Sequence, residues 1–227
     1  MGLAQRLLEV DESISAKLRE IGRSDEVTRI VVTKNHPVEL ARELFELGVR
    51  DFGENRDQEA GPKAQALTEQ IDTSGLTWHF VGQLQSNKAK RVVKYASTIH
   101  SVDRESLLEA LVACTASADN KTDVFLQVNL TDDPNRGGVH PDRLLEMAER
   151  VMVADGLRLV GVMAVGGLDQ DPRIEFERVA KLSERLRGVH PQADKISAGM
   201  SNDFLEALEY GATHLRIGTA ITGKRAI

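Results

Sequence analysis

A lysine stands directly after a short apolar run in the segment RIVVTKNHP. Residues 30–33 are all β-branched, and such side chains suit a pleated, packed surface, so residues 28–33 are predicted to form a buried strand. Lys34 therefore lies where a strand ends and a loop begins. Its amine is either an ordinary solvated charge, the commoner case for lysine, or a group presented to a ligand, with an aldehyde as the partner for an imine.

Two segments near the C-terminus carry small polar residues where a helix or a turn begins. AGMSND places Ser201 and Asn202 before a predicted helix as candidate N-caps, and RIGTA places Gly218 and Thr219 after a predicted strand. Free backbone N–H groups at such positions bind phosphate. Taken singly, each residue also has an ordinary structural explanation: Ser201 could serve merely as a helix cap, and Gly218 merely as a turn residue.

Arg216 is a cation on an otherwise apolar last strand, two residues before Gly218. Strand alternation puts Arg216 and Gly218 on the same face. A buried guanidinium is costly unless it is paired, so Arg216 should face an anion or a ring nitrogen. The alternative is a rim arginine paired with a glutamate, since the whole chain has 35 acidic residues. Together, an amine, a phosphate-binding pair of loops and a fixed cation match the aldehyde, the phosphate and the ring nitrogen of pyridoxal phosphate.

Strand-like segments alternate with helical segments along the whole chain. The predicted strands are residues 28–33, 49–55, 77–83, 97–103, 122–130, 157–165, 194–199 and 213–218. Repeated strand–helix units call for parallel pairing, and this number of strands closes a (β/α)₈ TIM barrel. The alternative is an open doubly wound sheet, but TKNH stands where its G-x-G-x-x-G turn belongs. We therefore expect one α/β barrel domain over residues 1–227, with ligands at the C-terminal ends of the strands.

Three helical features can be predicted outside the strands. The apolar residues of segment 1–22 fall on one helical face, which indicates an extra N-terminal helix docked on the barrel. Gly61 and Pro62 are expected to interrupt or bend the helix that contains them. Ser86 or Asn87 is expected to cap the helix that follows the third strand.

Composition excludes several classes of function. A net charge of −6 and 4% aromatic residues argue against a nucleic-acid binder, which needs a basic surface or a stacking platform. No apolar run approaches the roughly 20 residues of a membrane helix. The single cysteine, Cys114, excludes an internal disulfide and favours a cytoplasmic location. No metal-binding motif is present, and no apolar helix face beyond those of the core suggests association, so we expect a monomer.

A series of segments spans nearly the whole chain: VTKNHP, FGENRDQE, WHFVGQLQSNK, VNLTDDPNRGG, GVMAV, SAGMSNDFLEAL and GATHLRIGTAITG. In these segments the chain resembles the pyridoxal phosphate homeostasis protein family, whose members are similar to the N-terminal barrel of alanine racemase. The resemblance implies a set of residues that hold pyridoxal 5′-phosphate. Lys34 would form a Schiff base with it, and Arg216 would face its pyridine nitrogen. Its phosphate would be held by Ser201, Gly218 and Thr219. The rest of the pocket would be lined by Asn55, His79 and Met163.

The resemblance also implies a role in intracellular homeostasis of vitamin B6, in which the chain buffers the cofactor or delivers it to apo-enzymes without established catalysis. The alternative is an amino-acid racemase-like enzyme with weak activity. Racemisation on this scaffold needs a second base from a further β domain of a partner subunit, and we expect that domain to be absent because the chain ends shortly after its eighth strand. An arginine at the ring nitrogen also weakens the cofactor as an electron sink. Both arguments favour a protein that carries the cofactor over a racemase-like enzyme.

Overall fold

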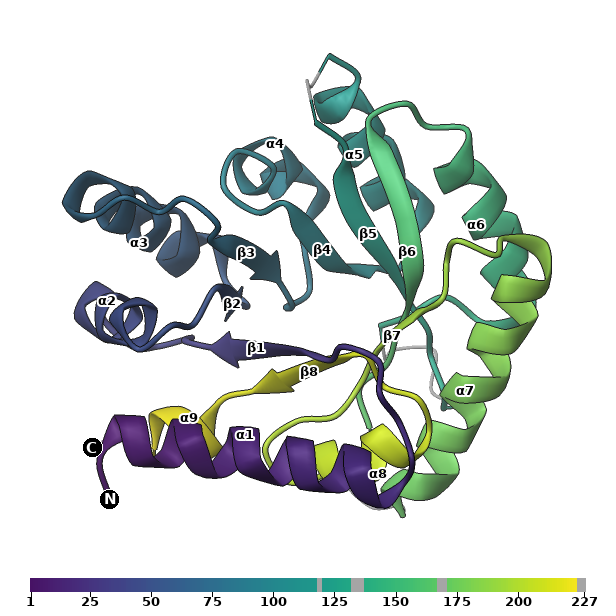
Figure 1. Ribbon diagram of the computed structural model, residues 1–227. Coiled ribbons are helices and arrows are strands. Elements are labelled where there is room, and N and C mark those ends of the chain that lie inside the picture. Colours follow the sequence, from purple (N-terminus) through teal and green to yellow (C-terminus); the bar gives the residue numbers. More distant parts are fainter. Residues whose placement is uncertain (118–119, 132–136, 167–170, 224–227) are drawn as a thin grey trace.

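Eight parallel strands close into a barrel in the computed structural model of the chain, which describes residues 1–117, 120–131, 137–166 and 171–223 (Figure 1). The strands are β1 Thr28–Val32, β2 Asp51–Glu54, β3 Thr77–Phe80, β4 Thr98–Val102, β5 Thr122–Gln127, β6 Leu157–Met163, β7 Lys195–Ser197 and β8 His214–Ile217. Each strand pairs with the next in the sequence, and β8 closes on β1 with Arg216 opposite Ile30. The predicted barrel is confirmed.

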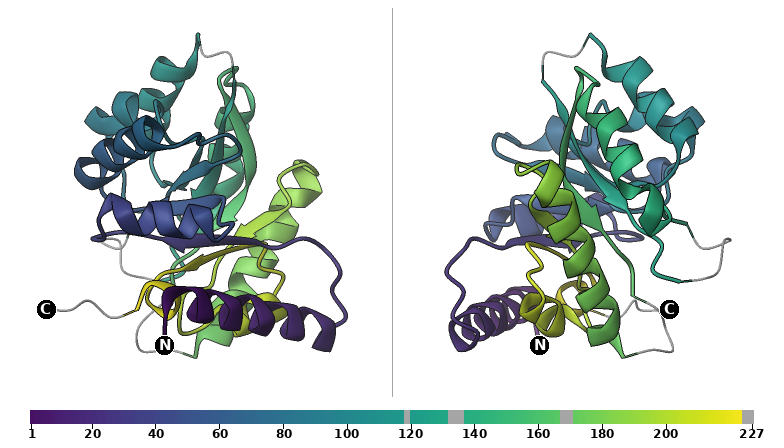
Figure 2. Two further views of the ribbon diagram at one scale, coloured as in Figure 1. Left: turned by 60° about the vertical axis from the view of Figure 1, so that its left-hand side comes forward. Right: turned by 90° about the vertical axis from the view of Figure 1, so that its right-hand side faces the viewer.

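Helices surround the strands on the outside of the barrel (Figures 1 and 2). They are α1 Leu3–Glu20, α2 Val38–Glu46, α3 Asp57–Gln70, α4 Ala89–Val92, α5 Glu105–Thr115, α6 Leu144–Met152, α7 Pro172–Val189, α8 Phe204–Glu209 and α9 Thr219–Thr222. Two short 3₁₀ helices, η1 Ser86–Lys88 and η2 Pro141–Arg143, lead into α4 and α6. None of the helices among the described residues is both long enough and apolar enough to cross a membrane.

The N-terminal helix α1 completes the outer ring beside β8. The helix that follows β8, α9, has only 4 residues, and α1 packs along α9 and α8 (Figure 1). Leu3, Leu7, Val10 and Ile14 of α1 are buried, as the one-sided pattern predicted. Arg6 fixes the contact, because its Nε donates to the carbonyl oxygen of Ile221 at 2.6 Å. The two ends of the described chain are thereby joined.

The strands separate two layers of side chains. Outward residues such as Phe52 and Trp78, with ring centroids 5.4 Å apart, belong to the apolar layer between the strands and the helices. The inward residues are far more polar than those of a usual barrel interior, where branched aliphatic residues dominate. His79 and His100 meet there, and the ring of Phe125 stacks on that of His100 at 4.5 Å.

Two of the helix predictions differ from the structure. Of the interruption or bend expected at Gly61 and Pro62, the interruption does not occur, since α3 runs on through Pro62 and a proline near the helix start disturbs few backbone hydrogen bonds. The prediction that Ser86 or Asn87 is a cap was wrong. The N-cap residue of η1 is Gln85, whose side chain makes no capping hydrogen bond. The hydroxyl of Ser86 instead accepts a hydrogen bond from Arg104 at 3.4 Å. Local sequence could not reveal this partner from the next βα unit.

Candidate functional site

Lys34 lies in a tight turn directly after β1. The turn is closed by the N–H of His36, which donates to the carbonyl oxygen of Thr33 at 3.1 Å. Asn35 has a φ of +62°, a left-handed conformation that asparagine tolerates better than most residues. Its N–H donates to the carboxylate of Glu59 at 2.8 Å. The turn therefore holds the exposed side chain of Lys34 at the C-terminal end of the barrel, as predicted.

A buried polar cluster supports this turn from below. The hydroxyl of Thr33 donates to Glu54 Oε1 at 2.7 Å. Lys63 of α3 forms an ion pair with the same oxygen and donates to the carbonyl oxygen of Thr33 at 2.8 Å. Glu54 and Lys63 are 1% and 6% exposed, so the pair is fully desolvated. The sequence reasoning did not identify either residue, although a lysine on the apolar face of a helix was a visible signal.

The loops after β7 and β8 meet at Ser201. Its hydroxyl oxygen accepts hydrogen bonds from the N–H groups of Gly218 and Ala220, each at 3.2 Å. Gly199 lets the loop after β7 pack closely on α8 (Phe204–Glu209), since it has a φ of +86° and an added Cβ would lie 2.7 Å from the Cβ of Ala207. Thr219 begins α9 beside these amides. The predicted corner of small polar residues is therefore brought together.

Ser201 and Asn202 are not caps of α8, so that interpretation was wrong. The helix begins at Phe204 with Asp203 as its N-cap residue. The carboxylate of Asp203 accepts a hydrogen bond from the N–H of Met200 at 2.6 Å. Ser201 is therefore not part of the helix start. Its hydroxyl oxygen instead connects the loop after β7 to the loop after β8.

Arg216 is 5% exposed and is held by neutral groups. It donates to the hydroxyl oxygen of Ser197 at 2.6 Å and to the carbonyl oxygen of Ala164 at 2.8 Å. Within the described residues it forms no ion pair, so the alternative of a rim arginine paired with a glutamate is not observed. Burial lowers the pKa of Arg216 to about 10, an effect that the charge of Asp203 opposes. Arg216 therefore stays charged at neutral pH.

The three remaining predicted pocket residues differ in their surroundings. Asn55 follows β2, and its Oδ1 is buried without a hydrogen-bond partner in the described part of the chain. Met163 is the last residue of β6 and is 1% exposed. Both ring nitrogens of His79 are already bonded inside the barrel, to His100 at 3.0 Å and to Asp51 at 2.9 Å.

Sequence reasoning missed the partners of His79 and Arg216. His100 Nδ1 lies 2.8 Å from the hydroxyl oxygen of Ser197, which also accepts from Arg216. The residues Asp51, His79, His100, Ser197 and Arg216 therefore form one continuous chain of hydrogen bonds, here called the interior chain. A signal was present, because both histidines fall inside predicted strands. In the structure each is the third residue of its strand, β3 or β4, and the two side chains meet inside the barrel.

The buried histidines make stability depend on pH. Burial lowers the pKa of His100 well below its usual value and that of His214 to about 3. Above pH 6.5 both are uncharged in the folded and unfolded chain; below it, only the unfolded chain takes up the protons. We expect urea denaturation to show the free energy of unfolding falling by about 1.4 kcal/mol per pH unit for each histidine between pH 6.5 and 5.

His214→Gln should remove about half of that slope, because only His100 remains. His140→Gln should leave the slope unchanged, since the side chain of His140 is 67% exposed. A slope that His214→Gln does not alter would show that other groups cause the acid sensitivity.

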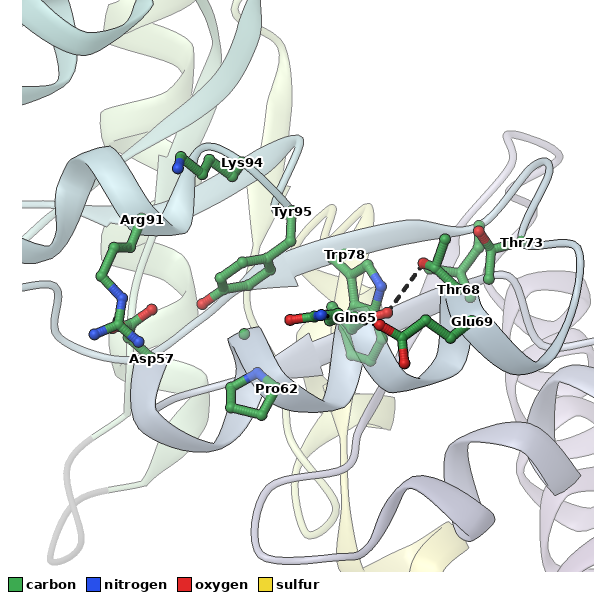
Figure 3. A pocket seen from close by; sticks show the side chains of 13 residues that line it. Asp57, Pro62, Gln65, Thr68, Glu69, Thr73, Trp78, Arg91, Lys94 and Tyr95 are labelled. Atoms are coloured by element: carbon green, nitrogen blue, oxygen red, sulfur yellow. Dashed lines mark hydrogen bonds and ion pairs between the residues drawn. The ribbon is translucent and has the colours of Figure 1, made fainter.

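A cavity lies outside the barrel, between α3 and α4 (Figure 3). It has a volume of about 680 Å³, and Trp78 and Tyr95 form part of its walls. At one end Arg91 forms an ion pair with Asp57, with 3.2 Å between Nε and Oδ2 (Figure 3). None of the predicted site residues lines this cavity. No group of side chains suited to a metal ion occurs within the described ranges.

The sequence and the fold match known proteins over nearly their full length. Residues 16–226 match the family described as alanine racemase, N-terminal domain. The pyridoxal phosphate homeostasis protein of Escherichia coli K12 is 34% identical, covering 98% of this chain and 97% of that protein. The chain belongs to the pyridoxal phosphate homeostasis protein family. The resemblance found in the sequence segments is thereby confirmed.

The solved structures of PipY and of an alanine racemase share the barrel. PipY of Synechococcus elongatus, solved with PLP bound, has a TM-score of 0.82 and 34% identity, covering 98% of this chain and 100% of PipY. Alanine racemase of Clostridium difficile 630 has a TM-score of 0.69 at 15% identity, covering 95% of this chain and 58% of the racemase chain. At that identity the racemase supports the fold alone.

Proposed function

We propose that this chain binds pyridoxal 5′-phosphate and serves its homeostasis, by holding the cofactor or delivering it to apo-enzymes, without catalytic turnover of its own. Family members named for this homeostasis, and PipY with PLP bound, support the proposal. The observation that carries it is Arg216, a buried cation two residues before Gly218 whose bonds within the described chain go only to neutral groups. Such a cation calls for an acceptor at the mouth of the barrel.

The residues present fit this cofactor. When bound, pyridoxal phosphate supplies an aldehyde that condenses with a lysine amine with loss of water, together with a phosphate and a ring nitrogen. Lys34 offers an exposed amine. The oxygen of Ser201 already accepts two N–H bonds, which leaves its O–H as a donor toward phosphate. The hydroxyl of Thr219 is proposed as a second donor, beside Gly218 at the start of α9.

Arg216 is proposed to donate a hydrogen bond to the ring nitrogen. The donor would be an N–H group that is not used in its bonds to Ser197 and Ala164. Its pKa of about 10 keeps it charged at neutral pH. A charged donor disfavours protonation of the acceptor nitrogen, and an unprotonated ring withdraws electrons weakly. This favours retention of the cofactor over amino-acid chemistry.

Two further side chains are proposed to complete the pocket. The buried Oδ1 of Asn55 lacks a partner among the described residues and can accept from the ligand. Met163, at the end of β6, is proposed to provide an apolar wall. His79 is proposed to lie deeper in the barrel than the cofactor and to act on the pocket only indirectly, through its hydrogen bond to His100.

Adding pyridoxal phosphate to the purified protein should produce a visible imine band with one lysine modified. Reduction with borohydride should fix the cofactor to the peptide that contains Lys34, as measured by mass spectrometry. Absence of the band would reject the proposed function. Attachment to another lysine would keep the binding but reject Lys34.

Turnover separates the carrier from the racemase-like alternative. The loaded protein should not convert L-alanine to D-alanine at an ordinary enzyme rate, because Arg216 is proposed to face the ring nitrogen. A rate of about 1 s⁻¹ or faster with saturating cofactor would identify an enzyme.

A further inference from the structure

The interior chain crosses the barrel from one end to the other. It starts at Asp51, the first residue of β2, where the side chain is 31% exposed. It runs through His79 on β3 and His100 on β4, and then reaches Ser197 at the end of β7 and Arg216 on β8. One end of the interior chain is a carboxylate open to solvent, and the other is the cation proposed to face the ring nitrogen.

The donors and acceptors of the interior chain have one consistent arrangement. The Asp51 carboxylate only accepts, so Nε2 of His79 carries a proton and Nδ1 of the neutral ring accepts. His100 must then donate through Nε2 and accept at Nδ1. The hydroxyl of Ser197 therefore donates to His100. This leaves the Ser197 oxygen free to accept from Arg216, which only donates.

An added proton breaks this arrangement. If His79 were charged, it would donate to His100, and His100 would donate to Ser197. Ser197 would then accept from both His100 and Arg216, and no described acceptor would remain for its own proton. A buried donor without a partner costs free energy. Burial lowers the pKa of His100, which acts in the same direction.

Other charged groups near the interior chain do not upset the arrangement. The ring of His214 lies 6.1 Å from that of His100 and 6.5 Å from that of His79, and its pKa of about 3 leaves it uncharged at neutral pH. Lys195 acts on His214 in the same direction as burial. Asp203 acts on Arg216, where it favours the charged form.

We infer that the interior chain has a single direction, with every donor pointing from Arg216 toward Asp51, and that it positions Arg216. Ser197, His100, His79 and Asp51 are its positioning residues. Hydrogen bonds aligned in one direction polarise one another, and the cation and the carboxylate stand at the matching ends. Ser197 and Ala164 fix two edges of the guanidinium, so its remaining N–H groups have a defined orientation. The link to the cofactor rests on the proposed function.

The tautomers can be measured without the cofactor. In ¹⁵N NMR spectra of the imidazoles of the unloaded full chain, His79 and His100 should both be neutral and protonated at Nε2. In Ser197→Ala the Nδ1 resonance of His100 should shift, because it loses its donor. A proton on Nδ1 of His100, or a charged His100, would overturn the inferred direction.

The positioning role is measured on the loaded protein. Ser197→Ala should weaken retention of pyridoxal phosphate about tenfold, the effect of one lost hydrogen bond to a charged group, and should shift the pH midpoint of the visible band. Ser197→Thr keeps the hydroxyl and should restore both. Ser101→Ala is the matched control, because Ser101 is equally buried on β4 and its hydroxyl has no partner in the described chain.

The outcomes separate the two proposals. If the wild-type chain shows no band, the proposed function fails, and the NMR result alone decides the direction of the interior chain. If the wild type binds but Ser197→Ala matches Ser101→Ala in affinity and pH profile, the positioning role is rejected and the cofactor site stands. If Ser197→Ala does not fold, the tautomers of the wild type still test the arrangement.

Discussion

Lys34→Ala should abolish the visible imine band that pyridoxal phosphate produces with the wild-type chain. The turn that carries Lys34 is held by backbone bonds of Thr33, Asn35 and His36 and by Glu59, none of which involves the Lys34 side chain. The substitution therefore removes an exposed amine and leaves the fold intact. Absorption spectra and borohydride labelling measure the loss, and we expect retention of the cofactor to fall at least about tenfold.

Lys34→Arg separates covalent attachment from charge. It keeps the positive charge but cannot form the imine, so it should lack the band while retaining more cofactor than Lys34→Ala. Lys63 is a competing lysine below the same turn, but its ammonium is occupied by Glu54 and the carbonyl oxygen of Thr33. A band that persists in Lys34→Ala, with the label on Lys63, would contradict the assignment.

The fold could be predicted because each strand carries its own signal. Residues 30–33 are β-branched and are followed by a turn, and comparable runs recur with helical segments between them. Strand ends were less accurate, since β1 stops at Val32 and β2 begins only at Asp51. The ends depend on hydrogen bonds to neighbouring strands, which local sequence does not contain.

The candidate site could be predicted only in part, because its contacts join distant segments. The corner of Ser201 and Gly218 followed from barrel topology, but Ser201 was assigned to the wrong partner, since a serine before a helix is usually its cap. The bond between His100 and Ser197 spans 97 residues, and no local pattern relates their strands across the barrel. The orientation of side chains along each strand was predictable, whereas the pairing across the interior required the structure.

Lys63→Met should strongly destabilise the protein, although Lys63 lies outside the proposed cofactor contacts. The ion pair of Lys63 and Glu54 is buried, and the substitution leaves the Glu54 carboxylate without its cation. Removing one partner of such a pair costs about 3–5 kcal/mol. For a chain of this size the midpoint of thermal unfolding should fall by about 10 °C. Urea and thermal denaturation monitored by circular dichroism measure both changes.

Two matched variants show whether the uncompensated charge is the cause. Glu54→Gln added to Lys63→Met removes the charge and keeps an oxygen that can accept from Thr33, so it should recover much of the lost stability. Lys181→Met breaks an exposed pair with Glu177 and should have little effect. If Lys63→Met is no worse than Lys181→Met, the cluster does not stabilise the fold. If Lys63→Met is destabilised as expected, the same cluster also explains how the Lys34 turn is held, because Lys63 anchors the carbonyl of the preceding residue.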